Sequence, residues 1–125
     1  MNPQPSSSSS PLTISVIVPV KNGGAGFRKC LSALTHAMSP SNELIVVADG
    51  DTDGSWQVAE EFGAKVLRIP VSRGPARARN LGAQSAQGDI LFFIDADVVP
   101  APNAILQVEA AFSRDPQLAA RFGSY

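Results

Sequence analysis

The amino-acid sequence predicts an α/β domain built on an open parallel sheet with helices on both faces. The first observation is that short, strongly apolar segments alternate along the chain with segments whose apolar residues recur at helical spacing. The second is that the alternation begins with a strand and repeats, which is the order that produces a parallel sheet with right-handed crossovers. At 125 residues the chain is long enough for one such domain with a real core.

The first half of the chain supplies two strands and two helices of this pattern. Residues 12–20 (LTISVIVPV) predict a strand that is apolar enough to be buried on both faces. The spacing of the apolar residues over 27–38 predicts a helix. Residues 44–48 predict the second strand, and a helix follows over about 54–62 with Asp53 as its N-cap.

The second half repeats the pattern. Residues 64–70 predict the third strand, and Pro75 is well placed as the first residue of the next helix, on which Leu81 is expected to face inward. Residues 89–95 (DILFFID) predict the fourth strand. A last helix is expected to start near Pro102.

Composition and charge exclude several classes of protein. A net charge of −1 gives the chain no electrostatic attraction to nucleic acid or to an anionic membrane. Residues 1–11 (MNPQPSSSSSP) predict a disordered tail, not a secretory signal, ahead of a domain over 12–125. No segment is long enough to span a membrane, so we expect a cytoplasmic protein that would be, at most, peripheral to a membrane in a longer form. The single cysteine, Cys30, excludes an internal disulfide and is expected to be a core residue.

The stretch DGDTDGSWQVAE at residues 49–60 fits the calcium-loop pattern D-x-[DN]-x-[DN]-G-x5-E at every defined position. A calcium-binding EF-hand needs a helix that runs directly into the first position of this loop. Here the apolar, β-branched run 44–47 precedes Asp49 and predicts a strand. The sequence therefore predicts a carboxylate-rich loop at the carboxyl end of a buried strand, not an EF-hand.

Carboxylates also follow the fourth predicted strand, as Asp95-Ala96-Asp97. Residues two apart can lie on one side of the chain, so both carboxylates can serve one site. Two close carboxylates repel unless a cation lies between them, and Mg²⁺ or Mn²⁺ prefers one or two carboxylates together with substrate phosphates. The sequence favours such a metal site at the strand end over two solvated aspartates.

The stretch SRGPARARN at residues 72–80 places Arg73 and Arg77 around the start of a predicted helix. Cations there oppose the helix dipole, which makes sense if an anion binds between them. The alternative is an exposed basic face, and the residues alone leave both open. Ligands of open parallel sheets bind outside the carboxyl ends of the strands, so the two stretches together suggest a nucleotide diphosphate bridged by a divalent cation.

Over about residues 13–113 the chain resembles the amino-terminal, nucleotide-binding half of family 2 glycosyltransferases of the GT-A (Rossmann-like) fold. The resemblance rests on ISVIVPVKNGG, ELIVVADGDTDGS and GPARARNLGAQSAQGDILFFIDADV in this order and spacing. It implies metal-dependent transfer of a sugar from a nucleotide diphosphate sugar to an acceptor hydroxyl. In that family IDADV is the Asp-x-Asp signature.

The resemblance also implies roles for particular residues. Asp97 would ligate the divalent cation, Mn²⁺ or Mg²⁺, and Asp95 would hold the ribose, the metal or both. Asp49 would lie against the base, and Arg77 or Arg79 would approach the nucleotide or the diphosphate. The end of the first strand would line the base and ribose pocket with Pro19, Val20, Lys21 and Asn22.

The chain departs from the family pattern in ways that bear on function. Ala48 stands where the family often has the first of two aspartates, which puts a preference for uridine in doubt. By resemblance, the acceptor-binding half and the catalytic base lie beyond residue 125, so the isolated chain is expected to bind donor without transferring sugar and to self-associate through an uncovered edge. A sugar nucleotidyltransferase and a non-catalytic nucleotide-binding fragment are the alternative functions. The sugar, the base and the acceptor stay open.

Overall fold

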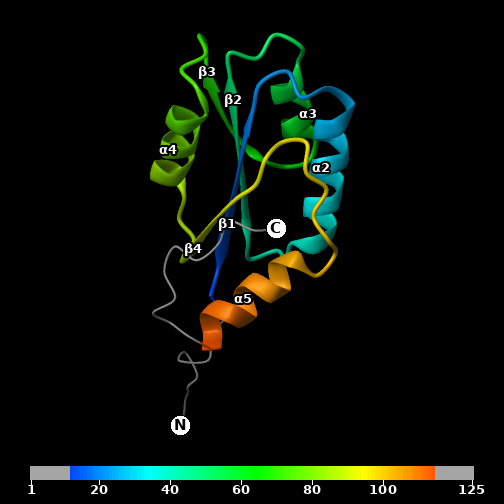
Figure 1. The fold of residues 1–125 in the computed structure, drawn as a ribbon, viewed down its shortest axis with the longest axis vertical. Helices are drawn as coiled ribbons and strands as arrows, with labels where there is room; N and C mark the ends of the chain where they lie inside the picture. The colour runs from blue at the N-terminus through cyan, green and yellow to red at the C-terminus, as the bar shows by residue number, and fades with distance from the viewer. Residues whose placement is uncertain (1–11, 115–125) are drawn as a thin grey trace.

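The computed structural model describes residues 12–114, where strands and helices alternate in the predicted order (Figure 1). The elements are β1 (Ile14–Val20), α2 (Gly24–Ala37), β2 (Glu43–Asp49), α3 (Ser55–Glu61), β3 (Lys65–Ile69), α4 (Pro75–Ser85), β4 (Ile90–Phe93) and α5 (Ala104–Arg114). The predicted tail over 1–11 lies outside the described residues. No helix within 12–114 is both long and apolar enough to cross a membrane.

The strands form one sheet in the order β3-β2-β1-β4, and each neighbouring pair is parallel. The parallel sheet predicted from the alternation is therefore confirmed. Because the strands are parallel, all their carboxyl ends lie at the same edge, at the top of Figure 1. In this order β3 and β4 are the two outer strands of the sheet, and β2 and β1 lie between them.

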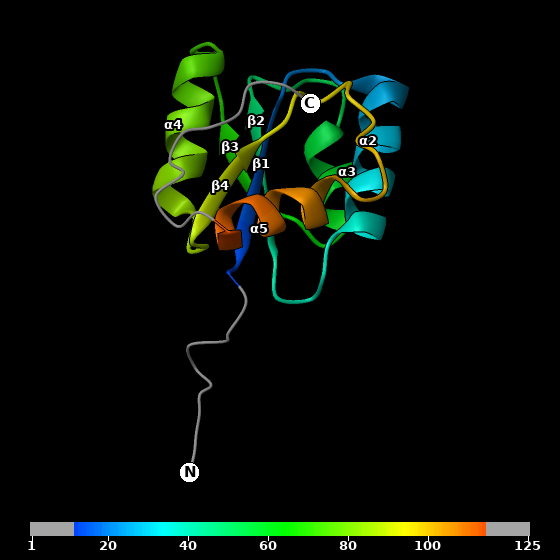
Figure 2. The same cartoon turned by 60° about the horizontal axis from the view of Figure 1, so that its bottom comes forward.

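Helices cover both faces of the sheet, as the sequence predicted (Figures 1 and 2). Helix α4 lies on one face, over a small apolar cluster that includes Ile17, Ile45 and Val47. Helices α2, α3 and α5 lie on the other face, over a larger cluster. β1 contributes Val16 and Val18 to the larger cluster and Ile17 to the smaller one, so it is buried on both faces.

Helix α4 lies close against the sheet because it carries glycine at the point of contact. A Cβ at Gly82 would lie 2.4 Å from Cγ2 of Ile17 and 3.3 Å from Cγ2 of Val47. The buried residues of α4 are Ala78 and Gly82, whereas Leu81 is only half-buried. The expectation that Leu81 would face the sheet was therefore wrong, since close approach at this contact requires a residue without a side chain.

Two further boundaries differ from the prediction. The N-cap of α3 is Gly54, with φ at 82°, and not Asp53. Asp53 still contributes, because its Oδ1 accepts hydrogen bonds from the Ser55 amide (3.0 Å) and the Ser55 hydroxyl (2.7 Å). Strand β4 is shorter than expected and ends at Phe93, although the Ile94 amide donates to the Ile17 carbonyl at 3.1 Å and prolongs the contact with β1.

At the amino ends of the strands, a polar contact joins β1, β2 and the turn before β4. The hydroxyl of Ser15, which is fully buried, donates to Glu43 Oε1 at 2.6 Å. The same carboxylate oxygen accepts the Gln87 amide at 2.9 Å, and the Gly88 amide donates to Ser15 Oγ at 2.8 Å. Burial alone would raise the pKa of Glu43. The hydrogen bonds from Ser15 and Gln87, together with the charge of Lys65, outweigh burial and lower the pKa of Glu43 below its ordinary value.

We expect Glu43→Gln to destabilise the protein by about 1 kcal/mol at pH 7, because a charge-assisted contact is lost. A carboxyl whose pKa is depressed by folding contributes stability above its unfolded pKa, and this stability is lost as the pH falls through the folded pKa. The variant should therefore lose less stability than the parent between neutral pH and about pH 3. Urea denaturation at several pH values measures this, with Glu60→Gln on exposed α3 surface as the control. Parallel pH profiles for parent and Glu43→Gln would contradict the prediction.

Candidate functional site

The residues singled out from the sequence lie at the carboxyl ends of the strands, in the loops that follow them, or in the first half of α4. In β1 the half-buried Pro19 pairs with Val47 of β2, and Val20 is buried. Lys21 and Asn22, immediately after the strand, are exposed. The top of the sheet is therefore apolar within the strands and polar immediately beyond them.

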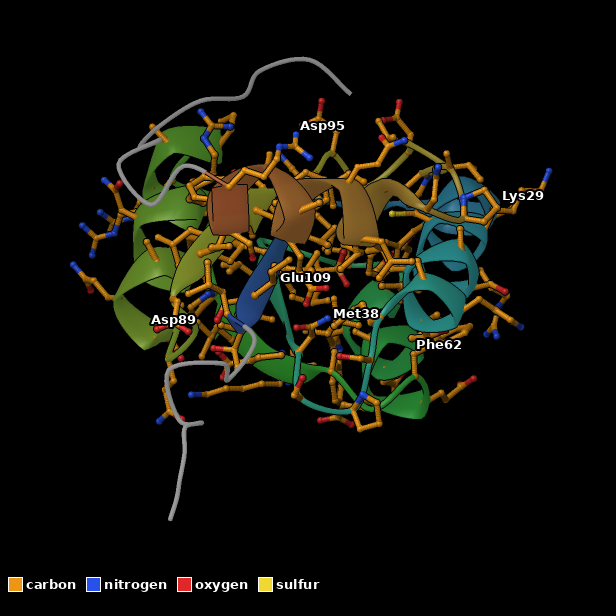
Figure 3. The ribbon with its side chains drawn as sticks, turned by 90° about the horizontal axis from the view of Figure 1, so that it is seen from below. Lys29, Met38, Phe62, Asp89, Asp95 and Glu109 are labelled. Atoms are coloured by element: carbon orange, nitrogen blue, oxygen red, sulfur yellow. The ribbon has the colours of Figure 1, made fainter. Side chains whose placement is uncertain are left out.

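Asp95 and Asp97 lie in the loop after β4, and both are exposed. Figure 3 shows the side chain of Asp95 projecting at the margin of the molecule. Helix α2 supports this loop from beneath, since the Cys30 thiol donates to the Asp95 carbonyl oxygen at 3.7 Å. A Cβ at Gly26 would lie 3.9 Å from Cβ of Asp97, so the helix backbone approaches Asp97 directly. The two aspartates are thus held on a supported loop.

The charges of both aspartates act on Cys30, which lies beneath their loop. Burial, and then the negative charges of Asp97 and Asp95, raises the pKa of the Cys30 thiol to about 11. Both carboxylates therefore act on the same point of α2. Cys30 is fully buried, which confirms it as a core residue, and a thiol with a raised pKa is neutral near pH 7.

The donor set at this loop fits a hard divalent cation that is shared with a ligand. Asp95 and Asp97 offer two exposed carboxylates on one short loop. Within residues 12–114 no group of three His, Cys, Asp or Glu side chains is arranged to hold a metal. Two carboxylates leave most of the coordination shell to water and to phosphate oxygens, which is the arrangement that Mg²⁺ usually adopts.

The acidic loop after β2 is joined to the loop after β1 through Asn22. The backbone of Asn22 is left-handed, with φ at 53°, a conformation that asparagine tolerates better than most residues. Its Oδ1 accepts the amides of Thr52 (2.8 Å) and Asp53 (3.1 Å). In return, its own amide donates to Asp51 Oδ1 at 2.8 Å. Nothing in the sequence pattern predicted this reciprocal contact.

The carboxylates of the acidic loop are directed at main-chain amides. Asp51 Oδ2 accepts the Trp56 amide at 3.0 Å, and Asp53 Oδ2 accepts the Gly24 amide at 3.2 Å. Hydrogen bonds from the Ser55 side chain and from the amides of Ser55 and Gly24 outweigh burial and lower the pKa of Asp53. Strand β2 runs directly into Asp49, which confirms the strand that distinguishes this loop from an EF-hand.

We expect calcium alone to bind this loop no more tightly than the millimolar range, because Asp51 and Asp53 are occupied by backbone amides. Calcium titration in the absence of nucleotide, followed by calorimetry, measures this. Asp53→Ala is the informative variant and Glu61→Ala, on α3, is its control. Micromolar binding that Asp53→Ala removes would show that the loop is a calcium site after all.

Asp49 has a structural position that the sequence did not reveal. Its side chain is 5% exposed, and its Oδ1 accepts the Arg73 amide at 2.9 Å. Its Oδ2 accepts the Ser72 hydroxyl at 2.9 Å and the Gly74 amide at 3.1 Å. Asp49 therefore fastens the segment that leads into α4 to the end of β2. Ala48, beside it, is 1% exposed and lies in the core.

Arg77 and Arg79, both exposed, lie on opposite flanks of α4. Arg77 lines a groove with the end of β3, together with Leu81 one turn later. Residues two positions apart on a helix are about 200° apart around its axis, so Arg79 lies on the flank of α4 that faces away from this groove.

Comparison with known proteins identifies relatives with a common activity. The model of the family "Glycosyl transferase family 2" matches residues 15–123. The glycosyltransferase AglE of Haloferax volcanii is 35% identical over 94 residues, which cover 70% of this chain and 31% of that protein.

Two solved structures share the fold. TarS 1–349 of S. aureus, in complex with UDP-GlcNAc, has a TM-score of 0.77 at 26% identity, over 82% of this chain and 32% of that one. Glucosyl-3-phosphoglycerate synthase of Mycobacterium tuberculosis, in complex with Mn²⁺, UDP and glucosyl-3-phosphoglycerate, has a TM-score of 0.60 at 33% identity, over 73% of this chain and 36% of that one. The chain spans about a third of the length of each of these proteins. With its four-stranded parallel sheet of the GT-A fold and a family match over most of its length, this chain belongs to glycosyl transferase family 2.

Proposed function

We propose that this chain forms the nucleotide-sugar-binding part of a metal-dependent glycosyltransferase. The observation that carries the proposal is the supported, exposed Asp95–Asp97 pair at the carboxyl end of β4 in a chain of this family. Crystals of TarS with UDP-GlcNAc, and of the synthase with Mn²⁺ and UDP, support a nucleotide diphosphate ligand and a divalent cation.

In this proposal Asp97, with Asp95, holds the cation against the diphosphate of the donor. When bound, a divalent cation stabilises the negative charge that develops on the leaving diphosphate. The aspartates contribute an anchored geometry, because α2 fixes their loop through the Cys30 thiol and the approach of Gly26. Because the loop is already held in place, ligand binding should cost little conformational entropy of the loop.

The nucleoside would lie over β1 and β2, beside Pro19, Val20, Lys21 and Asn22. The contact between Asn22 and the acidic loop fixes the wall of that pocket before any ligand binds. Asp49 borders the pocket, although both of its oxygens already accept hydrogen bonds from residues 72–74. Because Arg77 lines the groove beside β3 and Arg79 lies on the flank of α4 away from it, we assign the approach to the diphosphate to Arg79 in preference to Arg77.

Calorimetry of the purified protein with UDP and GDP, each with and without Mn²⁺, tests the proposal. We expect binding that requires both the diphosphate and the cation, and that the corresponding monophosphates reproduce poorly. The nucleotide that binds with the higher affinity, UDP or GDP, indicates the base of the donor. Ala48 does not indicate this base, because its side chain is buried. Formation of a nucleotide sugar from a nucleoside triphosphate and a sugar phosphate would contradict the proposal in favour of a nucleotidyltransferase.

A further inference from the structure

A groove of about 340 Å³ lies along β3, at the side of the sheet opposite to Asp95 and Asp97. It is lined by residues 68–71 at the end of β3 and by Arg73, Arg77 and Leu81. Its volume is within the range of about 300–1,000 Å³ that small-molecule sites occupy. Two strands lie between β3 and β4, and adjacent strands are about 4.8 Å apart, so the groove is about 14 Å across the sheet from the aspartate-bearing strand.

The floor and rim of the groove are apolar. Ile69 and Leu81 are half-buried, and Ile69 packs against the cluster beneath α4. At the rim, Val71 is 70% exposed, which is the largest exposure among the exposed large hydrophobic residues of the described chain. The exposed side chain of Val71 therefore offers apolar contact area to a ligand in the groove.

Two guanidinium groups at the groove are available to an anion. Arg73 and Arg77 are exposed, and the ion pair found within residues 12–114 joins a different pair, Arg28 and Glu61. Arg68 is already engaged, since its guanidinium lies 4.0 Å from the centre of the Trp56 ring. Asp49 lies near the backbone of Arg73, but its oxygens accept the Ser72 hydroxyl and the Arg73 and Gly74 amides.

We infer that this groove binds a small organic anion with an apolar body and a phosphate group, without the help of a metal. Arginine pairs with phosphate through two parallel hydrogen bonds, and the anion would also offset two cations that stand at the amino-terminal turn of α4. The apolar body would lie on Ile69, Val71 and Leu81. The groove lies across the sheet from the strand that precedes Asp95 and Asp97, and the proposed anion would bind there whether or not a donor binds at the aspartates.

The experiment uses 1-naphthyl phosphate as the probe, in EDTA, with protein whose Ile, Leu and Val methyl groups are observed by NMR. We expect the methyl signals of Ile69, Val71 and Leu81 to shift on titration. Arg77→Gln should weaken binding about ten- to a hundredfold, since a hydrogen bond to a charged group is lost. Arg114→Gln, which removes an exposed arginine at the end of α5 on the other face of the sheet, is the matched control and should bind the probe as the parent does.

Three results would overturn the inference. One is an unchanged affinity in Arg77→Gln with an unchanged melting temperature. Another is equal binding of 1-naphthol, which lacks the phosphate. The third is displacement of the probe by UDP with Mn²⁺, which would make the groove part of the donor site. The methyl shifts of the parent protein test the location even where a variant fails to fold.

Discussion

Asp97→Ala should abolish the Mn²⁺-dependent part of nucleotide diphosphate binding. Asp97 supplies one of two carboxylates at the proposed cation site, and within residues 12–114 no cluster of three His, Cys, Asp or Glu side chains could take over. Loss of an outer-shell partner of a metal ligand typically costs about 10–100-fold in affinity. Loss of a direct ligand should therefore cost at least about a hundredfold. Calorimetric titration of UDP or GDP with and without Mn²⁺ measures the difference.

The fold should survive this change, because Asp97 is exposed and its loop is held by other contacts. The Asp95 carbonyl accepts the Val98 amide at 3.1 Å and the Cys30 thiol at 3.7 Å, and neither contact uses the Asp97 carboxylate. Glu60→Ala, which removes an exposed carboxylate from α3, is the control for net charge. If Asp97→Ala and the parent bound nucleotide with the same dependence on Mn²⁺, the assignment of Asp97 as a ligand would be wrong.

The architecture could be predicted from the sequence because it depends on local patterns. Apolar β-branched runs and helical spacing can each be recognised within about ten residues of sequence. The alternation of the two patterns predicts the parallel sheet. The parallel sheet in turn sets which loops share an edge, so the gathering of Asp49, Lys21 and Asp95 at one edge follows from topology. The resemblance to the Asp-x-Asp signature added the identity of the family.

What the sequence did not reveal depends on contacts between distant residues. Asp49 accepts hydrogen bonds from residues 23 to 25 positions later, and Asn22 bonds a loop 29 to 31 positions later. Arg77 and Arg79 are two positions apart in the motif, and residues two positions apart on a helix are separated by about 200°, so they belong to different flanks. The motif alone suggests the same role for Arg77 and Arg79, whereas the helix directs their side chains to different flanks.

Asp49→Ala should lower the stability of the ligand-free protein by about 2–4 kcal/mol. The substitution leaves the Ser72 hydroxyl and the amides of Arg73 and Gly74 without their acceptor, and Asp49 itself is 5% exposed. An unsatisfied buried donor costs about 1–3 kcal/mol, and part of that cost is relieved because Arg73 is exposed and water can reach the segment. For a domain of about 100 residues this corresponds to a fall in melting temperature of roughly 10 °C or more.

This prediction separates two roles for the same carboxylate. If Asp49 served only to contact a nucleotide base, the ligand-free protein would be as stable without it, and only nucleotide binding would weaken. If it fastens residues 72–74 to the end of β2, stability falls without ligand and the amides of Arg73 and Gly74 exchange faster with solvent.

Asp49→Asn, which keeps one acceptor oxygen, should be intermediate in stability between the parent and Asp49→Ala. Asp95→Ala, at the exposed end of β4, should change stability by no more than about 0.5 kcal/mol. Equal melting temperatures for Asp49→Ala and Asp95→Ala would return Asp49 to the role that the family resemblance implies, because its hydrogen bonds would then contribute nothing to the folded chain.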